Sequence, residues 1–145
     1  MGRILIQFVE RPDSEDPEEM IRWFCHVFGL AGNDEENSLS EQILRAFIDA
    51  AYRDMGLSSS ELHLDTELAR STVIYHLNRF IEAGLLVKKG RRYYLRASEM
   101  EKAIKEIEYD INREMQRMLD TAKRFDTLME HSKRIKAGGS RRESD

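Results

Sequence analysis

Apolar residues in the first part of the chain recur mainly at helical spacing. A helix is predicted from Asp16 to about Phe28, because Asp16 is a favourable cap and Pro17 a favourable first residue. Its apolar positions follow the 3.6-residue period and predict a buried aromatic face: Met20, Trp23, Phe24, Val27 and Phe28. We expect this face to belong to the core rather than to line a ligand pocket.

Two further elements follow from the pattern on either side of this helix. Ile4, Ile6 and Phe8 alternate with polar residues and predict a short strand. Ser38 and Glu41 have the spacing of a capping box, which predicts a second helix over residues 39–55. Its apolar set is Ile43, Leu44, Phe47, Ile48, Ala51 and Tyr52.

Residues 58–97 predict a helix, a turn, a second helix and a hairpin. Ser58 and Glu61 form another capping box, and the turn is expected at about residues 66–69. The second helix is predicted over residues 70–83, with Gly84 in the left-handed conformation that ends it. Strands over residues 85–88 and 93–96 then flank a turn at residues 89–91. This order is typical of a winged helix-turn-helix, with the hairpin as the wing.

A long apolar repeat occupies the C-terminal third. Ser98 and Glu101 suit a capping box, and neither Gly nor Pro interrupts residues 98–136. The repeat has heptad spacing with one stutter and runs through Met100, Ile104, Ile107, Ile111, Met115, Met118, Ala122, Phe125 and Met129. We expect a dimerisation helix with its partner contacts at Ile104, Ile107, Ile111, Met115, Met118, Ala122 and Phe125. Its parallel or antiparallel orientation is left open by the sequence.

Charge is distributed unevenly along the 145 residues. Residues 1–67 carry 15 acidic and 5 basic side chains, whereas residues 68–97 carry 7 basic side chains and one acidic side chain. An overall net charge of −4 therefore conceals a basic cluster on the helix-turn-helix pattern. Such a cluster on such a pattern favours contact with nucleic acid over an ordinary solvated surface.

Composition excludes several classes of protein. No apolar run approaches the roughly 18 residues of a membrane span. The single cysteine, Cys25, cannot form an internal disulfide and suits a reducing cytoplasm. No nucleophile–base set or phosphate-binding loop is present, so we expect neither an enzyme nor a bound cofactor.

The segment 61–85 resembles the winged-helix transcriptional regulators of the ArsR-like group, including many archaeal ones. The matching residues are Glu61-Leu62, Ser71-Thr72-Val73, His76-Leu77, Phe80 and Ala83-Gly84-Leu85. Two positions depart from the group's pattern: Glu67 stands where Gly is usual, and Ala69 stands where a Ser or Thr cap is usual. The resemblance implies a winged-helix fold, DNA as partner and a structural role for His76.

Val73, Leu77 and Phe80 are expected to face the core, which turns the other side of the 70–83 helix outward. On that side and on the wing, the expected DNA contacts are Arg70, Ser71, Thr72, Tyr75, Asn78, Arg79, Lys88, Lys89, Arg91 and Arg92. The alternative is a winged-helix module that binds protein, for which the outward, apolar Ile74 is suited. His63 and Asp65 occupy positions where the ArsR-like group can carry metal-binding cysteines. We expect no metal there, because no thiolate is present.

The expected fold is mostly α with a small β wing, followed by a long coiled-coil-like helix. The predicted parts are an N-terminal strand and helix (1–37), a winged helix-turn-helix (38–97), a dimerisation helix (98–136) and a disordered tail (137–145). The predicted function is that of a homodimeric, cytoplasmic, sequence-specific regulator of transcription that binds double-stranded DNA. Its operator, its effector and the sign of regulation are not encoded in recognisable motifs.

Overall fold

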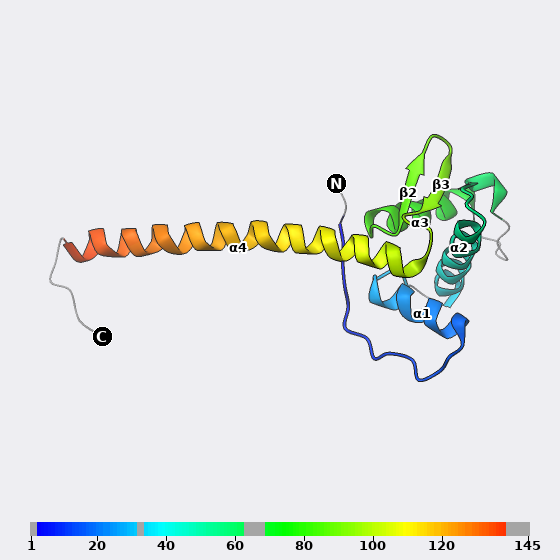
Figure 1. Cartoon of the computed structure of the whole chain (residues 1–145), viewed down its shortest axis with the longest axis horizontal. Coiled ribbons are helices and arrows are strands. Elements are labelled where there is room, and N and C mark those ends of the chain that lie inside the picture. Colours follow the sequence, from blue (N-terminus) through cyan, green and yellow to red (C-terminus); the bar gives the residue numbers. More distant parts are fainter. Residues whose placement is uncertain (1–2, 32–33, 63–68, 139–145) are drawn as a thin grey trace. The chain divides into compact units, whose positions relative to one another are not determined.

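The computed structural model describes residues 3–31, 34–62 and 69–138, and for 34–38 and 137–138 it describes the backbone alone. In chain order the elements are α1 (Pro17–Val27), α2 (Asp34–Tyr52), β1 (Leu57–Ser58), the 3₁₀ turn η1 (Ser59–Glu61), α3 (Arg70–Glu82), β2 (Leu86–Lys89), β3 (Arg92–Leu95) and α4 (Met100–Gly138) (Figure 1). The mainly helical architecture with a small antiparallel sheet agrees with the sequence prediction. No helix in the described ranges has both the length and the apolar composition of a membrane span.

The chain divides into two compact units, Met1–Ile107 and Glu108–Asp145. The first contains the sheet and all the helices up to the start of α4. The second contains residues 108–138 of α4 as a continuous helix. The boundary falls inside the helix predicted over residues 98–136.

The core of the first unit surrounds α2. Leu39, Ile43, Leu44 and Phe47 of this helix are completely buried, and the Phe47 ring meets Tyr93 of β3 edge-on at 6.5 Å between centroids. The helix begins at Asp34, four residues before the expected Ser38 cap, and ends at Tyr52. Tyr52 was expected on the apolar face but is 68% exposed, because the buried stripe runs through Ala50 instead.

α1 begins as predicted, with the Asp16 side chain accepting the Glu18 N–H at 3.1 Å. Its buried face differs in part from the prediction: Phe28 is buried as expected, but the other two buried residues are Ile21 and Cys25. Ile21, Cys25 and Phe28 recur at i, i+4 and i+7, so they form an apolar stripe that shares only Phe28 with the expected one. Trp23 and Phe24 are half-buried at the edge of the helix.

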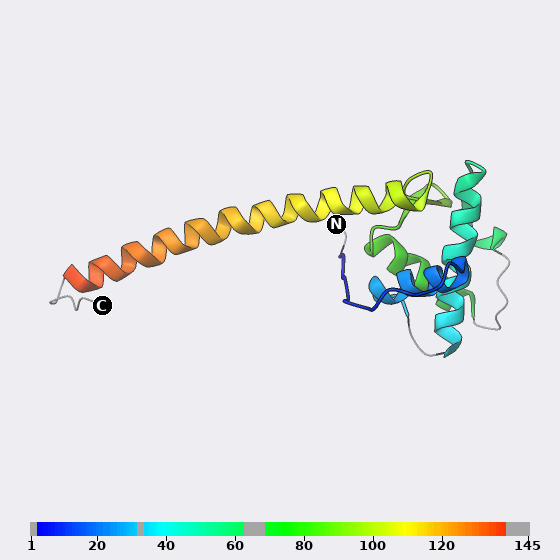
Figure 2. The ribbon, with the colours of Figure 1, turned by 60° about the horizontal axis from the view of Figure 1, so that its bottom comes forward.

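Residues 4–9 form no strand, contrary to the sequence prediction. The segment is extended, but it crosses the ends of two helices instead of pairing with a strand. The Arg3 N–H donates to the carbonyl of Glu82, and the Gln7 N–H donates to the carbonyl of Val27; Figure 2 shows the path of this segment beside α1. A β-ladder requires a neighbouring strand, and the alternation of apolar and polar residues in one segment does not show whether such a strand is present.

The sheet has the strand order β1–β3–β2, with both pairings antiparallel. Two-residue β1 was not predicted, because a strand this short carries no alternation. Lys89 pairs with Arg92, so the turn consists of Gly90 and Arg91 rather than residues 89–91. The positive φ of Gly90 (63°) accommodates this tight turn, and both hairpin strands shift by one residue from their predicted positions.

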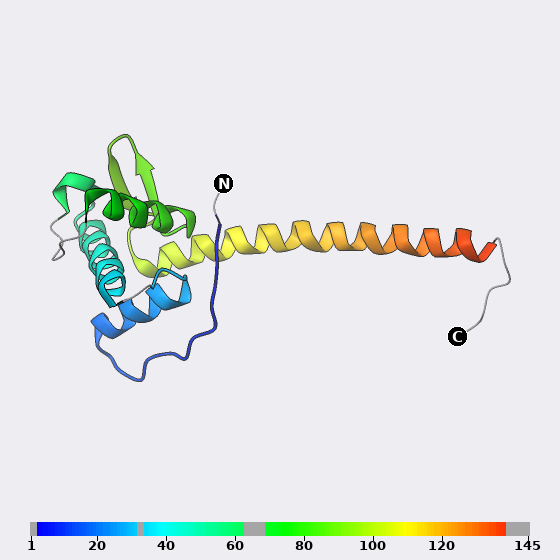
Figure 3. The same cartoon turned by 180° about the vertical axis from the view of Figure 1, so that it is seen from behind.

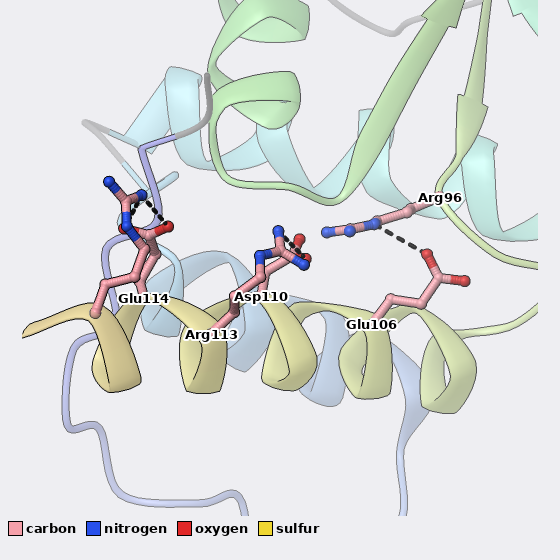
Figure 4. A network of polar contacts seen from close by, with 6 residues as sticks. Arg96, Glu106, Asp110, Arg113 and Glu114 are labelled. Atoms are coloured by element: carbon pink, nitrogen blue, oxygen red, sulfur yellow. Dashed lines mark hydrogen bonds and ion pairs between the residues drawn. The ribbon is translucent and has the colours of Figure 1, made fainter. Parts of the chain in front are cut away.

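α4 begins after Glu99, whose carbonyl accepts the Ala103 N–H, so the expected cap Ser98 lies one residue too early. In the first unit, Arg96 bonds Glu106 at 3.0 Å (Figure 4). In the second unit, ion pairs within the helix join Arg113 to Asp110 and Arg117 to Glu114 (Figure 4). Local pairs of this kind add only about 0.3–0.5 kcal/mol each to a helix.

Candidate nucleic-acid interface

The inner face of α3 is set by four buried side chains. Val73, Leu77 and Phe80 are buried as predicted, and His76 lies beside them at 1% exposure. The helix ends in a Schellman motif: the Leu85 N–H donates to the Phe80 carbonyl, and the N–H of Gly84, at φ 86°, donates to the Ile81 carbonyl. These contacts fix which side of α3 faces outward (Figure 3).

The N-terminal end of α3 has no side-chain cap, because Ala69 precedes Arg70. The Ala69 carbonyl accepts the N–H groups of Thr72 and Val73, which is the ordinary start of the helix. Ser71 is exposed in the first turn. Free N–H groups in a first turn favour an anion such as a phosphate.

The outward face of α3 presents a small set of polar side chains. Tyr75 is 60% exposed, and Asn78, one turn further along, is also exposed. Ile74 and Thr72 are half-buried at the margins. Arg70 is exposed and donates to the Ser59 hydroxyl at 3.0 Å, so it links α3 to η1.

Arg79 has a different position from the one the sequence suggested. It is half-buried, and its guanidinium donates to the carbonyl of Gly29, in the loop after α1. The guanidinium carbon also lies 6.0 Å from the centre of the Tyr75 ring. Arg79 therefore joins α3 to α1 and orients Tyr75, instead of extending from the outer face.

The hairpin carries the exposed cations Lys88, Lys89 and Arg91 beside α3 (Figures 1 and 3). The ammonium nitrogen of Lys88 lies 5.3 Å from the centre of the Tyr93 ring, and that of Lys89 lies 5.5 Å from the Tyr94 ring. Lysines held over aromatic rings at exposed sites gain about 0.5–1 kcal/mol and lose some of their freedom. The sequence prediction did not single out these two tyrosines, because the pairing of Lys88 with Tyr93 depends on the register of the hairpin.

Arg92 is the fourth cation of the hairpin, and it is already paired. It donates to both carboxylate oxygens of Glu61, at 2.9 and 3.3 Å, and to the carbonyl of Gly56. Glu61 also accepts the Ser58 N–H at 2.8 Å, as the predicted capping box requires. The Ser58 hydrogen bonds, with a further contribution from Arg92, lower the pKa of Glu61.

The predicted helix after Ser58 consists of the single turn η1, since Leu62 is already extended at φ −74° and ψ 123°. The expected turn at 66–68, Glu67, and the metal candidates His63 and Asp65 lie outside the described residues. Within the described ranges, no three His, Cys, Asp or Glu side chains are grouped as metal ligands.

The residues expected to form the dimer interface fall into two groups. Ile107 is 2% exposed and packs within the first unit of its own chain, near Gly84, and Ile104 is half-buried there. Ile107 is therefore a core residue, and the prediction that it contacts a partner was wrong. In the second unit, Ile111 is half-buried, whereas Met115, Met118 and Phe125 are 44–59% exposed and Ala122 is also exposed.

Exposed apolar residues in the second unit keep a regular spacing. From Ile111 the intervals to Met115, Met118, Ala122, Phe125 and Met129 are four, three, four, three and four residues. Leu119, Leu128 and Ile135 flank this row and are 55–65% exposed. The helix over residues 108–138 is about 46 Å long at 1.5 Å per residue, so the apolar row extends over several turns.

Family models, curated proteins and solved structures were compared with this chain, and none of them matches it. The candidate interface consequently rests on its own geometry and charge. The hairpin that carries three exposed cations packs against α3, which exposes Ser71, Tyr75 and Asn78.

Proposed function

We propose that this protein is a sequence-specific DNA-binding regulator of transcription that acts as a homodimer. In this proposal α3 enters the major groove, and the β2–β3 hairpin contacts the phosphate backbone. The observation that carries it is the set of exposed cations Lys88, Lys89 and Arg91 on a hairpin that packs against α3, in a chain that is otherwise acidic.

The order of elements supports a winged helix-turn-helix. Helix α2, the short β1, the turn η1, helix α3 and the hairpin follow one another as in that fold, and β1 lies beside β3 at the sheet edge. The segment 63–68, where the rest of the first helix of the motif is expected, is outside the described residues. α3 is then the recognition helix.

Sequence specificity is assigned to Tyr75 and Asn78. Both are exposed and lie one turn apart on the same face, where an amide can bond a base edge and a phenol can bond a base or a phosphate. Ser71 and the first-turn N–H groups of α3 are assigned to phosphate. Arg79, which bonds the Gly29 carbonyl, is assigned to holding this face in position.

Affinity is assigned mainly to the hairpin. Lys88, Lys89 and Arg91 each supply one cation for a phosphate, whereas Arg92 is neutralised by Glu61. Phosphate contacts contribute to affinity on any sequence and weaken as salt rises. Three such contacts per protomer give six in a dimer.

Dimerisation is assigned to residues 111–129 of α4. A row of exposed apolar side chains at heptad spacing is the pattern of a helix that packs against another helix. A second copy of the chain provides an identical row, and two copies present two α3 helices to two half-sites. The orientation of the two helices is left open.

The test is selection of bound duplexes from a random library by the full-length protein. The proposal expects enrichment of one motif with two related half-sites, and binding that falls as salt is raised. The rival function is a protein-binding module that uses Ile74 and Tyr75. Retention of no duplex at low salt, or retention without any enriched motif, would favour that module and refute the proposal.

A further inference from the structure

Residues 10–13 of the N-terminal segment and one side of α1 line an open cavity. The cavity has a volume of about 470 Å³ and is lined on one side by Met20, Trp23 and Phe24 of α1. On the other side it is lined by residues 10–13 of the N-terminal segment. Small-molecule sites commonly have volumes of about 300–1,000 Å³ and apolar, aromatic walls with few polar groups.

The aromatic wall is held in a defined orientation. The Trp23 indole N–H donates to the carbonyl of Val9 at 3.1 Å. The rings of Trp23 and Phe24 meet edge-on, with centroids 5.1 Å apart and an angle of 62° between their planes. Both side chains are half-buried, so their remaining surface faces the cavity rather than the core.

The surrounding charge is negative. Glu10 and Asp13 line the cavity with one basic residue, Arg11, and Glu19 lies nearby in sequence at the start of α1, whereas Glu18 pairs with Arg45. Residues 10–19 together carry six carboxylates against one basic side chain. An aromatic wall with a carboxylate rim is the arrangement that attracts an organic cation, because ring faces and carboxylates both favour positive charge.

The same N-terminal segment connects this cavity to the end of α3. Beyond Val9, the Gln7 N–H bonds the last residue of α1, and the Arg3 N–H bonds the Glu82 carbonyl at the last residue of α3. Leu5 packs so closely on Gly29 that a Cβ at that position would come within 2.8 Å of it. Gly29 is also the residue whose carbonyl holds Arg79.

We propose that the cavity between residues 10–13 and Met20, Trp23 and Phe24 binds a small organic cation with an aromatic or apolar body, and that its occupancy tightens the N-terminal segment against α1 and α3. The site itself is independent of DNA binding. Its use as an effector site rests on the proposed function, since it would act through the segment's bond to the end of α3.

Trp23 is the single tryptophan of the chain, so its fluorescence reports the cavity directly. The probes are benzyltrimethylammonium, benzyl alcohol and benzenesulfonate, which share a ring and differ in charge. The cation should change Trp23 emission saturably and bind about tenfold more tightly than the neutral alcohol, and the sulfonate should bind most weakly. No saturable change with the cation, or equal affinity for all three probes, would overturn the proposal.

Substitution of carboxylates inside and outside the lining tests whether the cation binds in this cavity. Glu10→Gln with Asp13→Asn should remove most of the preference for the cation, whereas Glu15→Gln, which removes one carboxylate outside the lining, should retain it. All three side chains are exposed, so the variants test the cavity with little effect on the core. Equal losses in the double variant and in Glu15→Gln would assign the binding to general charge and overturn the site.

Coupling to the segment is measured by hydrogen exchange of the Gln7 and Arg3 amides. With benzyltrimethylammonium at ten times its Kd, exchange should slow by up to about tenfold if opening of the segment destroys the site. Unchanged exchange during saturation of Trp23 would refute the coupling while leaving the site. Neither measurement uses DNA, so failure of the proposed function would be recognised separately.

Discussion

Replacing Lys88 with Ala should change the salt dependence of DNA binding by an amount that follows from the structure. Lys88 is exposed on the hairpin and is assigned one phosphate contact per protomer, which makes two per dimer. Each phosphate contact adds about 0.9 to the slope of log K against log salt, so the slope should fall by about 1.8. If nothing else changes, affinity at 0.1 M salt falls by about 60-fold in the same treatment.

The matched comparison is the ion pair between Arg92 and Glu61. The double variant Glu61→Gln with Arg92→Gln removes this pair without altering net charge, and Gln retains an acceptor for the Ser58 N–H. Its slope should equal that of the native protein. Lys102→Ala, which removes an exposed cation on α4, serves as the control for charge alone.

The salt dependence of DNA affinity is measured for all four proteins by fluorescence anisotropy of a labelled random duplex. Salt concentrations between roughly 50 and 200 mM cover the range over which such slopes are resolved. The reasoning is refuted if the double variant lowers the slope as much as Lys88→Ala does. It is equally refuted if Lys88→Ala and Lys102→Ala have the same slope, because a lysine on the hairpin would then contribute no more than a lysine on α4.

Three further predictions concern the dimer, the recognition helix and the thiol. Met118→Asp with Phe125→Asp should give a monomer in sedimentation with unchanged circular dichroism, since both side chains are exposed in the single chain; a persistent dimer would place the interface elsewhere. Arg79→Ala should lower the thermal midpoint and weaken binding to selected and random duplexes about equally, because the guanidinium bonds Gly29; a loss confined to the selected duplex would assign it to a base. Cys25 should react with Ellman's reagent only on unfolding, because burial, with a smaller contribution from Glu41, raises the pKa of its thiol to about 12. The thiol's contribution to stability should therefore be complete below its unfolded pKa of about 8.5 and be lost as pH rises toward 12, and a Cys25→Ala variant should lack this loss.

Local rules were sufficient where a short segment determines its own conformation. Asp16 caps α1, Gly84 takes the left-handed conformation after α3, and Glu61 accepts the Ser58 N–H, all as the sequence indicated. Each of these features depends on neighbours within about four residues. The same is true of the inward positions Leu77 and Phe80, which helical spacing defines.

Contacts between residues far apart in the sequence determine the partners of two arginines that local patterns did not predict. Arg79 and Gly29 are 50 residues apart, and Arg92 and Glu61 are 31 apart, so neither pairing has a local pattern. Both arginines were expected to contact DNA, and both have partners within their own chain. The outward face inferred from periodicity was correct in direction, but it did not indicate which cations remain unpaired.

Two apolar patterns were misinterpreted for a related reason. α1 has apolar residues around most of its circumference, so two stripes fit the helical period, and packing buries the one that contains Ile21 and Cys25. In α4 the heptad row continues from core residues into exposed ones, and Ile107 belongs to the core. Periodicity identifies an apolar face but not the molecule that covers it.

The proposed function requires that the outer face of α3 distinguish one DNA sequence from another through Tyr75 and Asn78. The most direct measurement is the Kd of the native protein, Tyr75→Ala and Asn78→Ala on the selected duplex and on a random duplex, at one fixed salt concentration. We predict a loss of about 1–3 kcal/mol in binding free energy for each variant on the selected duplex and a much smaller loss on the random one. Equal, small losses on both duplexes would leave only nonspecific electrostatic binding and would contradict the account.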